Sequence, residues 1–245
     1  MFSSGLVSIS FRNHSPGVIA SAAAASGLSQ IEWGSDIHAP RGDLFRLTEL
    51  AAAPLPCCSY GTYFRLGIDP LDELPEYIQA AKKLGTDHLR IWAGRKCAAA
   101  YTPEERQRFL EQCAAAASVA EAHGAVLCLE CHRRSYTETK EGALELMQYV
   151  DSPHFRMYWQ PNPDISTGEN LAYIRLLRQY ITHVHVFHWV RDRRLSLQEG
   201  IPVWLRYLEA LGGNHHLLLE FMPDDRLESL KEEADALHKL IRFFP

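Results

Sequence analysis

The most constraining feature of this 245-residue sequence is a regular alternation of short apolar runs with longer segments of helical periodicity. The short runs have the length of buried strands and are bounded by polar or turn-forming residues. Eight of them can be placed: Val7–Phe11, Gln30–Trp33, Pro56–Tyr60, His88–Trp92, Val126–Glu130, Phe155–Gln160, His183–Phe187 and Leu217–Glu220. Strands that alternate with helices in this way predict a parallel sheet covered by helices.

The segments between the strands carry the start and stop signals of helices. Ser15 precedes Pro16, which is a cap residue followed by proline at the first helical position, and predicts a helix over Pro16–Ser26. Thr102-Pro-Glu-Glu has a capping hydroxyl with an acid three residues later, and predicts a helix that runs to about His123. Apolar residues at helical spacing predict further helices at Thr139–Val150, Asn170–Tyr180, Leu197–Leu211 and Leu227–Phe243.

Eight strand–helix units favour closure of the sheet into a (β/α)8 TIM barrel, and 245 residues is a usual length for one such barrel. No linker rich in Pro, Gly or Ser interrupts the alternation, so we expect residues 1–245 to form a single domain. The first strand is followed by Phe11-Arg-Asn-His-Ser-Pro, which contains no glycine. A Rossmann fold or a phosphate-binding loop is therefore disfavoured.

Composition narrows the classes of partner. The formal net charge is −5, and the densest basic group is only Arg191, Arg193 and Arg194, so we expect no nucleic-acid binding. No apolar stretch approaches the roughly eighteen residues that a membrane span needs, and the N-terminus lacks a signal peptide's apolar core. The six cysteines form no paired CxxC framework, which favours reduced thiols. We expect a cytoplasmic protein that does not bind membranes.

Four polar residues end apolar strands: Glu130, Gln160, His185 and Glu220. In a barrel of this type the carboxyl ends of all strands meet at one mouth, where active sites lie. A buried carboxylate without a partner is costly, so Glu130 and Glu220 need a counter-charge. A shared metal ion supplies one; an ion pair with an arginine such as Arg90 is the alternative.

The other two strand-end residues differ in how well they suit a metal ion. His185 alternates with His183 and projects to the same side of its strand, whereas His188 has the opposite parity. A lone strand histidine is usually a hydrogen-bonded core residue, but two acidic strand ends beside it favour a ligand. The amide oxygen of Gln160 binds a hard cation less tightly than a carboxylate does. Gln160 is therefore either a weak ligand or an orienting amide.

Further residues at or beyond the strand ends are candidates for substrate contacts. His132 lies two residues beyond Glu130 and suits hydrogen bonds to substrate hydroxyls or to a ligand carboxylate. Arg191 suits a phosphate or carboxylate, although it is equally compatible with a solvated loop arginine beside Asp192. Trp92 suits stacking on a sugar or packing at the barrel rim. The full set of expected substrate contacts is His38, Trp92, His132, Asn162, His188 and Arg191.

Several segments, taken in order, carry a family resemblance. They are Gln30-Ile-Glu-Trp-Gly, His38-Ala-Pro-Arg-Gly-Asp, Leu127-Cys-Leu-Glu-Cys-His followed by Tyr136-Thr-Glu-Thr, His183-Val-His-Val and Leu217-Leu-Leu-Glu. Together they resemble the xylose isomerase-like barrel superfamily, and within it the sugar phosphate isomerase/epimerase group. The resemblance spans nearly the whole chain and implies an enzyme of carbohydrate metabolism.

The resemblance implies a metal-dependent proton transfer. Family enzymes hold one divalent ion, commonly Mn2+, Mg2+, Co2+ or Zn2+, with two glutamates, an aspartate and a histidine. They move a proton between adjacent sugar carbons through a cis-enediolate, and their two glutamates serve as acid and base. Carried over by position, Glu130 and Glu220 are ligands and acid/base pair, His185 is a ligand, Gln160 is the fourth ligand, and Arg191 contacts the substrate. The resemblance also allows a homodimer.

The sixth strand departs from the family pattern. The resembling segment usually has aspartate at the position of Gln160, and often histidine at that of Pro163. Loss of a negative charge weakens the affinity of such a site for a cation. Two alternatives to an isomerase follow: a barrel that binds carbohydrate without turnover, and a metal-dependent hydrolase or endonuclease-like relative. The sparse ligands and the acidic charge argue against the second.

Overall fold

Within residues 1–244, which are those that the computed structural model describes, eight parallel strands close into a barrel. Their order around the barrel is β1-β10-β7-β6-β5-β4-β3-β2. The strands are β1 (Ser3–Val7), β2 (Gln30–Gly34), β3 (Cys57–Leu66), β4 (His88–Ala93), β5 (Val126–Glu130), β6 (Phe155–Trp159), β7 (Ile181–Val186) and β10 (His216–Leu219). The predicted (β/α)8 barrel is confirmed; Pro245, at the end of the predicted domain, lies outside the described residues.

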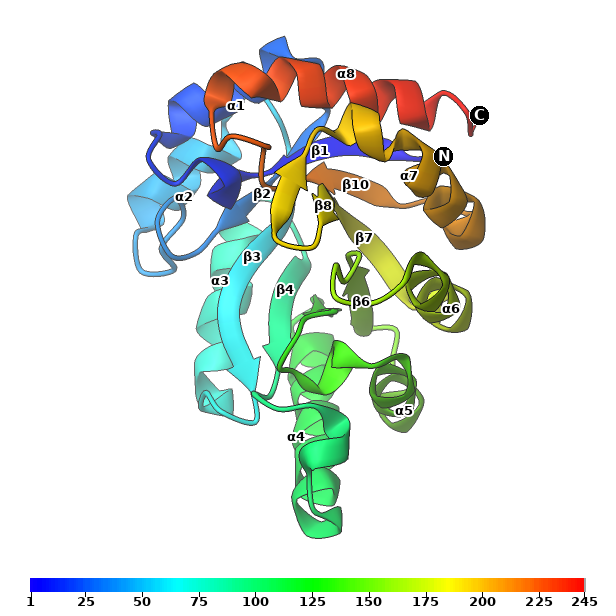
Figure 1. Cartoon of the computed structure of the whole chain (residues 1–245). Helices are drawn as coiled ribbons and strands as arrows, with labels where there is room; N and C mark the ends of the chain where they lie inside the picture. The colour runs from blue at the N-terminus through cyan, green and yellow to red at the C-terminus, as the bar shows by residue number, and fades with distance from the viewer. Residues whose placement is uncertain (245) are drawn as a thin grey trace.

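Helices surround the strands as an outer ring (Figure 1). They are α1 (Pro16–Ala25), α2 (Leu44–Ala51), α3 (Leu74–Lys83), α4 (Pro103–Ala122), α5 (Lys140–Val150), α6 (Thr167–Leu177), α7 (Leu197–Leu211) and α8 (Leu230–Ile241). The two ends of the chain meet beside β1, where the rings of Phe2 and Phe244 lie 5.7 Å apart between centroids. No helix of the described chain is both long and apolar enough to span a bilayer.

Local sequence signals account for several helix boundaries. The Thr102 hydroxyl accepts a hydrogen bond from the backbone of Glu105, whose carboxylate accepts one from the backbone of Thr102 in return, which confirms the predicted start of α4. Ser166 and Glu169 form the same reciprocal cap. For that reason α6 begins at Thr167, three residues before the predicted Asn170. The bounds of α7 match the prediction.

One predicted element needs correction, and three further elements were not predicted. The first strand lies at Ser3–Val7, and the alternating stretch predicted as strand, Ser8–Phe11, is a buried 3-10 turn. Here the Ser8 hydroxyl accepts a hydrogen bond from the backbone N–H of Gly34, so the turn is tied to β2. The helices α2 and α3 were not placed from the sequence. A short antiparallel hairpin after β7, formed by β8 (His188–Val190) and β9 (Arg193–Leu195), was also not foreseen.

The barrel interior below the mouth is filled by stacked aromatic rings. The fully buried imidazole of His183 lies between the rings of Tyr158 and His216, at centroid distances of 4.5 and 4.6 Å. Burial lowers the pKa of His183 well below its usual range, and the neighbouring His216 and His88 lower it further. Burial likewise lowers the pKa of His216. His183 and His216 are therefore neutral in the folded protein at neutral pH.

We expect the stability of the barrel to fall with pH below about 6.5, where the unfolded chain protonates histidines that stay neutral when folded. Replacement His183→Phe keeps the stacked ring and removes one such group. The pH slope of the free energy of unfolding should then decrease by up to about 1.4 kcal/mol per pH unit. Urea unfolding at pH 7.5, 6.0 and 5.0 measures this slope. The variant Tyr158→Phe is the control and should keep the original slope; equal slopes in His183→Phe and the unsubstituted protein would contradict the prediction.

Candidate functional site

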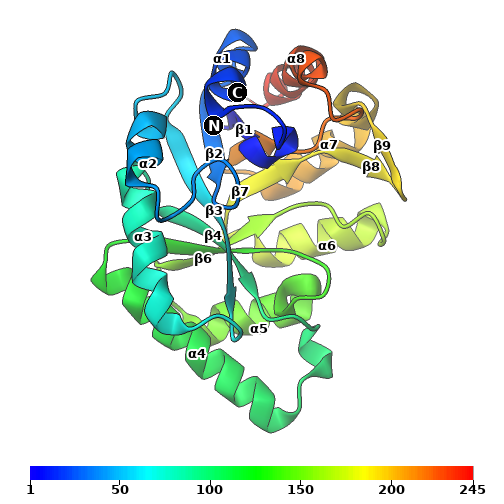
Figure 2. The ribbon, with the colours of Figure 1, turned by 90° about the vertical axis from the view of Figure 1, so that its left-hand side faces the viewer.

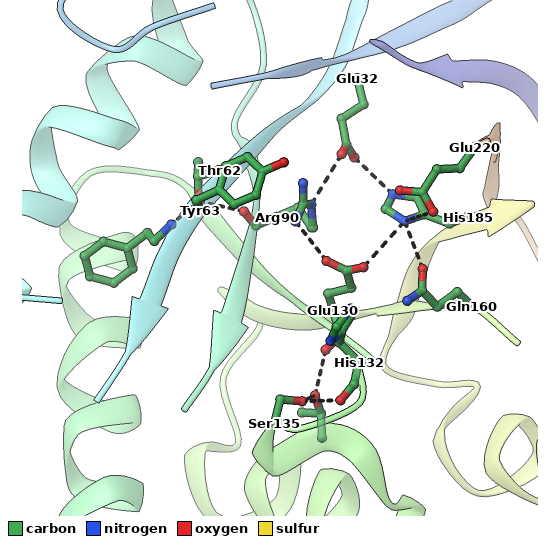
Figure 3. A network of polar contacts seen from close by, with 12 residues as sticks. Glu32, Thr62, Tyr63, Arg90, Glu130, His132, Ser135, Gln160, His185 and Glu220 are labelled. Carbon is green, nitrogen blue, oxygen red and sulfur yellow. Dashed lines mark hydrogen bonds and ion pairs between the residues drawn. The ribbon is translucent and has the colours of Figure 1, made fainter. Parts of the chain in front are cut away.

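Charged and polar side chains from six strands converge at the mouth of the barrel (Figure 3). Glu130 is the last residue of β5, and Gln160 and Glu220 follow directly after β6 and β10. His185 belongs to β7, while Glu32 and Arg90 come from β2 and β4. Arg90, Glu130, Gln160 and Glu220 line a cavity of about 230 Å³. The structure thus brings together the four strand-end residues that the sequence singled out.

Arg90 is a buried cation between two carboxylates. Its Nη1 lies 2.8 Å from Oε2 of Glu130, and its Nε lies 3.4 Å from Oε1 of Glu32. The side chain of Arg90 is only 2% exposed, and that of Glu32 is fully buried. The two carboxylates outweigh the cost of burying the guanidinium and raise the pKa of Arg90 above its usual range. The alternative that Arg90 neutralises a strand-end glutamate is therefore realised at Glu130.

A glycine on the intervening strand makes room for this ion pair. Gly61 lies on β3, between the strands that carry Glu32 and Arg90. A Cβ atom at this position would lie 2.6 Å from Oε1 of Glu32 and 3.1 Å from Nη2 of Arg90. No side chain fits in that space unless the carboxylate moves. Gly61 is thus required by close approach rather than by backbone conformation.

His185 lies at the centre of the acidic groups. Its Nε2 lies 3.5 Å from Oε2 of Glu32. Around its Nδ1 are three oxygens: Oε1 of Gln160 at 3.3 Å, Oε2 of Glu220 at 3.5 Å and Oε1 of Glu130 at 3.9 Å. Burial alone would lower the pKa of His185, but the carboxylates of Glu220, Glu32 and Glu130 outweigh it and raise the pKa to about 9.

The carboxylates of the site differ in their affinity for protons. Burial raises the pKa of Glu220 to about 7, with His185 opposing the shift and Glu130 adding to it. Burial would also raise the pKa of Glu32, but His185 and Arg90 outweigh it, so that the pKa is lowered. Two cations, Arg90 and His185, therefore offset the negative charges of this buried cluster. A pKa of about 7 places the protonation of Glu220 near neutral pH.

The donor set can be compared with what a divalent ion requires. Donor atoms that share an ion at about 2.1 Å lie about 3.0–3.4 Å apart, slightly closer than the 3.3–3.9 Å found around Nδ1 of His185. Among residues 1–244, no group of three or more His, Cys, Asp or Glu side chains has the geometry of a metal site. By residue type, two carboxylates, an imidazole and an amide oxygen fit a hard or borderline divalent ion. The donor atoms are therefore of the types that a divalent ion binds, but they lie slightly farther apart than they would around a bound ion.

Three of the six expected substrate contacts line the cavity: Trp92, His132 and Asn162. The rings of Trp92 and His132 are stacked with centroids 4.4 Å apart, and the guanidinium of Arg65 covers the indole of Trp92 at 4.0 Å. The backbone N–H of Asn162 donates to Oδ1 of Asn170 in α6, which fixes the segment after β6. The cavity lining thus combines a stacked aromatic pair with the amide side chains of Gln160 and Asn162.

The other three expected contacts, His38, His188 and Arg191, lie away from the cavity wall. His38 is buried, and its Nδ1 lies 3.0 Å from the Ser8 hydroxyl in the turn after β1. The ring of His188 packs against Gly200 of α7, where a Cβ would approach it to 2.7 Å. Arg191 occupies the turn of the β8–β9 hairpin with a positive φ of 56° and is exposed. Arg191 is therefore not among the residues that line the cavity.

Several residues of the cavity and its buried network were not selected from the sequence. Glu32 lies one residue before the end of a predicted strand, so a signal similar to that of Glu130 and Glu220 was available for it. Arg90 was considered only as an alternative counter-charge for a strand-end glutamate, although a charge within an apolar strand also signals an inward position. Other polar and aromatic cavity residues were not selected, because they come from loops, from the hairpin after β7 or from the unpredicted extension of β3. They include Arg12, Tyr63, Arg133, Trp189 and Phe221.

Comparison with known proteins supports a family assignment. The profile of the family described as xylose isomerase-like TIM barrel matches residues 21–240. A curated 3-dehydroshikimate dehydratase from Bacillus anthracis is 26% identical over 106 residues, which are 41% of this chain. That match spans 36% of the relative, so the chain matches about a third of the relative's length.

Solved structures share the whole fold at low sequence identity. AsbF of Bacillus anthracis, described as a probable 3-DHS dehydratase, has a TM-score of 0.80 at 20% identity, with 97% of this chain and 99% of that chain covered. The IOLI protein, solved with a bound zinc atom, has a TM-score of 0.76 at 14% identity and 99% coverage of both chains. An L-ribulose 3-epimerase has a TM-score of 0.72 at 15% identity, covering 99% of this chain and 97% of that chain.

The family profile covers most of the chain, and the closed parallel barrel agrees with it. This protein belongs to the xylose isomerase-like TIM barrel family.

Proposed function

We propose that this protein is a divalent-metal-dependent isomerase or epimerase of a sugar or sugar phosphate. The observation that carries the proposal is the convergence of Glu130 and Glu220 on His185 at the barrel mouth, in a cavity that opens to solvent. Two carboxyl groups at one small cavity suit the removal of a proton from carbon and its return. The relatives include a dehydratase and epimerases, so a sugar-processing enzyme is consistent with the family.

In this proposal the protein's own residues position and move the proton. Arg90 holds Oε2 of Glu130, which leaves Oε1 on the side of His185 and Glu220. Glu130 and Glu220 take up and return the proton between adjacent carbons, by way of a cis-enediolate. Glu130, Gln160, His185 and Glu220 would hold the divalent ion. When bound, such an ion stabilises negative charge that develops on substrate oxygens.

The cavity limits the size and charge of the substrate. Its volume of about 230 Å³ is below the roughly 300–1,000 Å³ of sites for drug-sized ligands, so a small molecule is expected. Arg12 and Arg133 line the cavity, each paired with an aspartate, Asp36 and Asp164 respectively. Guanidinium groups suit a phosphate or carboxylate. Trp92 and His132 offer a stacked aromatic wall for the apolar face of a sugar.

A dehydratase is a second candidate, because the curated relative and the AsbF structure are both described as dehydratases of this kind. Elimination of water beside a carbonyl also begins with removal of a proton from carbon, so the same carboxylates serve. The two reactions are separated by their products. Incubation with a panel of ketoses and ketose phosphates in D2O tests for deuterium at the carbon beside the carbonyl, by NMR. Incubation with 3-dehydroshikimate tests for loss of water, by mass spectrometry.

The acid/base assignment predicts that Glu130→Gln and Glu220→Gln each lower kcat on the identified substrate by about 10²–10⁴-fold, the usual contribution of a positioned acid or base. Steady-state kinetics measures this loss. Glu209→Gln, which changes an exposed glutamate of α7, is the matched control and should keep full activity. Full turnover in either active-site variant would refute the assignment. Binding of carbohydrate without turnover in the unsubstituted protein would favour the non-catalytic barrel.

The proposed ligand role of Gln160 predicts that Gln160→Asp binds Mn2+ more tightly, because a carboxylate replaces a neutral amide oxygen beside His185. We expect a gain of about tenfold in affinity, in keeping with the tenfold or larger effects of residues around metal sites. Isothermal titration calorimetry with Mn2+ measures it without reference to activity. Asn162→Asp adds the same charge to the cavity wall at a residue outside the proposed ligand set, and it should gain less. An equal gain in both variants would contradict a ligand role.

The buried ion pairs predict that Arg90→Met destabilises the protein strongly. The change leaves Glu32 and Glu130 without their cation, and breaking a buried pair in this way costs about 3–5 kcal/mol. Urea unfolding measures the free energy of unfolding. Arg46→Met, which breaks the exposed pair with Glu49, is the control and should cost at most about 1 kcal/mol. A similar loss of unfolding free energy in both variants would show that the buried pairs of Arg90 stabilise the protein no more than an exposed pair does.

A further inference from the structure

The hairpin β8–β9 forms one wall of the cavity. It leaves the barrel after β7 and projects beside α7 (Figure 2). Trp189 of this hairpin lines the cavity together with Phe187 and Phe221, and its ring centroid lies 5.3 Å from that of Phe187 and 5.8 Å from that of Phe221. The aromatic wall therefore joins the hairpin to the segment after β10, although about thirty residues of sequence separate them.

Arg194, on the returning strand of the hairpin, contacts both sides of this wall. Its guanidinium lies 5.2 Å from the ring centroid of Trp189 and 5.0 Å from that of Phe221, within the range of a cation–π contact. It also forms an ion pair with Asp225, in the loop that follows β10. One half-buried side chain thus links the hairpin to the loop after β10 through three contacts.

Phe221 directly follows Glu220 and has an unusual backbone conformation. Its φ is +55°, which is strained for an aromatic residue and is retained only where the surroundings impose it. Its backbone N–H donates to the Ser10 hydroxyl at 3.0 Å, and its ring contacts Trp189 and Arg194. The direction in which the Glu220 side chain leaves the backbone depends on this peptide. A group that holds Phe221 therefore also holds Glu220.

We propose that Arg194 is a positioning residue, which clamps Phe221 and Trp189 against the cavity and thereby fixes the carboxyl group of Glu220. The expected effect of Arg194 on turnover rests on the proposed function. Its expected effect on the conformation of the hairpin does not. In this role the hairpin contributes to the site through Trp189 and Arg194, while Arg191 at its tip does not contact the cavity. Loss of the clamp lets the strained peptide relax and moves Glu220.

Three variants test the clamp. Arg194→Met keeps a flexible, unbranched stem and removes the guanidinium, so both the cation–π contacts and the ion pair with Asp225 are lost. Arg194→Lys keeps a cation and should restore much of the function. Arg193→Met removes the neighbouring exposed arginine of the same strand, and serves as the matched control. Thermal unfolding of all three establishes that each is folded.

The first measurement does not depend on turnover. The protein has five tryptophans, so 5-fluorotryptophan labelling gives a small set of 19F NMR signals, and Trp189→Phe identifies that of Trp189. We expect Arg194→Met to shift or broaden the Trp189 signal, and Arg193→Met to leave it unchanged. An unchanged Trp189 signal in folded Arg194→Met would overturn the clamp, whatever reaction the protein catalyses.

The second measurement tests the effect on Glu220. On the identified substrate we expect Arg194→Met to lower kcat by about tenfold or more with a smaller change in KM, since misplacement of a catalytic group by about 1 Å costs up to about 10²-fold. Arg194→Lys should recover most of kcat, and Arg193→Met should match the unsubstituted protein. A changed Trp189 signal with unchanged kcat would overturn the positioning of Glu220. Absence of any turnover in the unsubstituted protein concerns the proposed function, and leaves the NMR test of the clamp intact.

Discussion

The site depends on the buried contact of Arg90 with Glu32 and Glu130. A guanidinium that is 2% exposed inside a barrel is stable only with carboxylates beside it, and these carboxylates in turn need the cation. Gly61 leaves the space that this contact requires. Through Glu32 the same network reaches Nε2 of His185, and through Glu130 it reaches the cavity. The packing of the upper barrel and the arrangement of the proposed catalytic groups therefore both depend on the contact of Arg90 with Glu32 and Glu130.

The cations of the cluster explain how three glutamates occur in one buried region. Arg90 and His185 lie between the carboxylates, and burial raises the pKa of Glu220 to about 7, although the nearby His185 opposes this shift. A divalent ion at His185 would replace the proton of that imidazole as counter-charge. The neutral amide of Gln160 needs no cation beside it, whereas the aspartate that the family pattern implies at this position would. The buried cluster of this chain therefore carries one negative charge fewer than the family pattern implies.

The loops above the strands determine what the barrel can hold. Trp92 and His132 form a stacked wall, Arg12 and Arg133 stand at the rim, and the hairpin after β7 adds Trp189. These loops also place residues that the sequence suggests as substrate contacts at different distances from the cavity. His188 packs onto α7, and Arg191 lies in the exposed hairpin turn. Substrate preference within the family is expected to follow from such loop geometry, because the strands below are shared.

The sequence by itself determined the alternation of strands and helices, the closed barrel and the approach of Glu130, Gln160, His185 and Glu220, because strand periodicity and strand ends are local signals. Capping residues likewise fixed α4. Only the tertiary structure decided that Glu32 joins this group, that Arg90 pairs with both Glu32 and Glu130, that His38, His188 and Arg191 lie away from the cavity, and that a hairpin forms after β7. Ion pairing between strands 40 or more residues apart, and the path of a loop, depend on packing of the whole barrel. No local pattern encodes them.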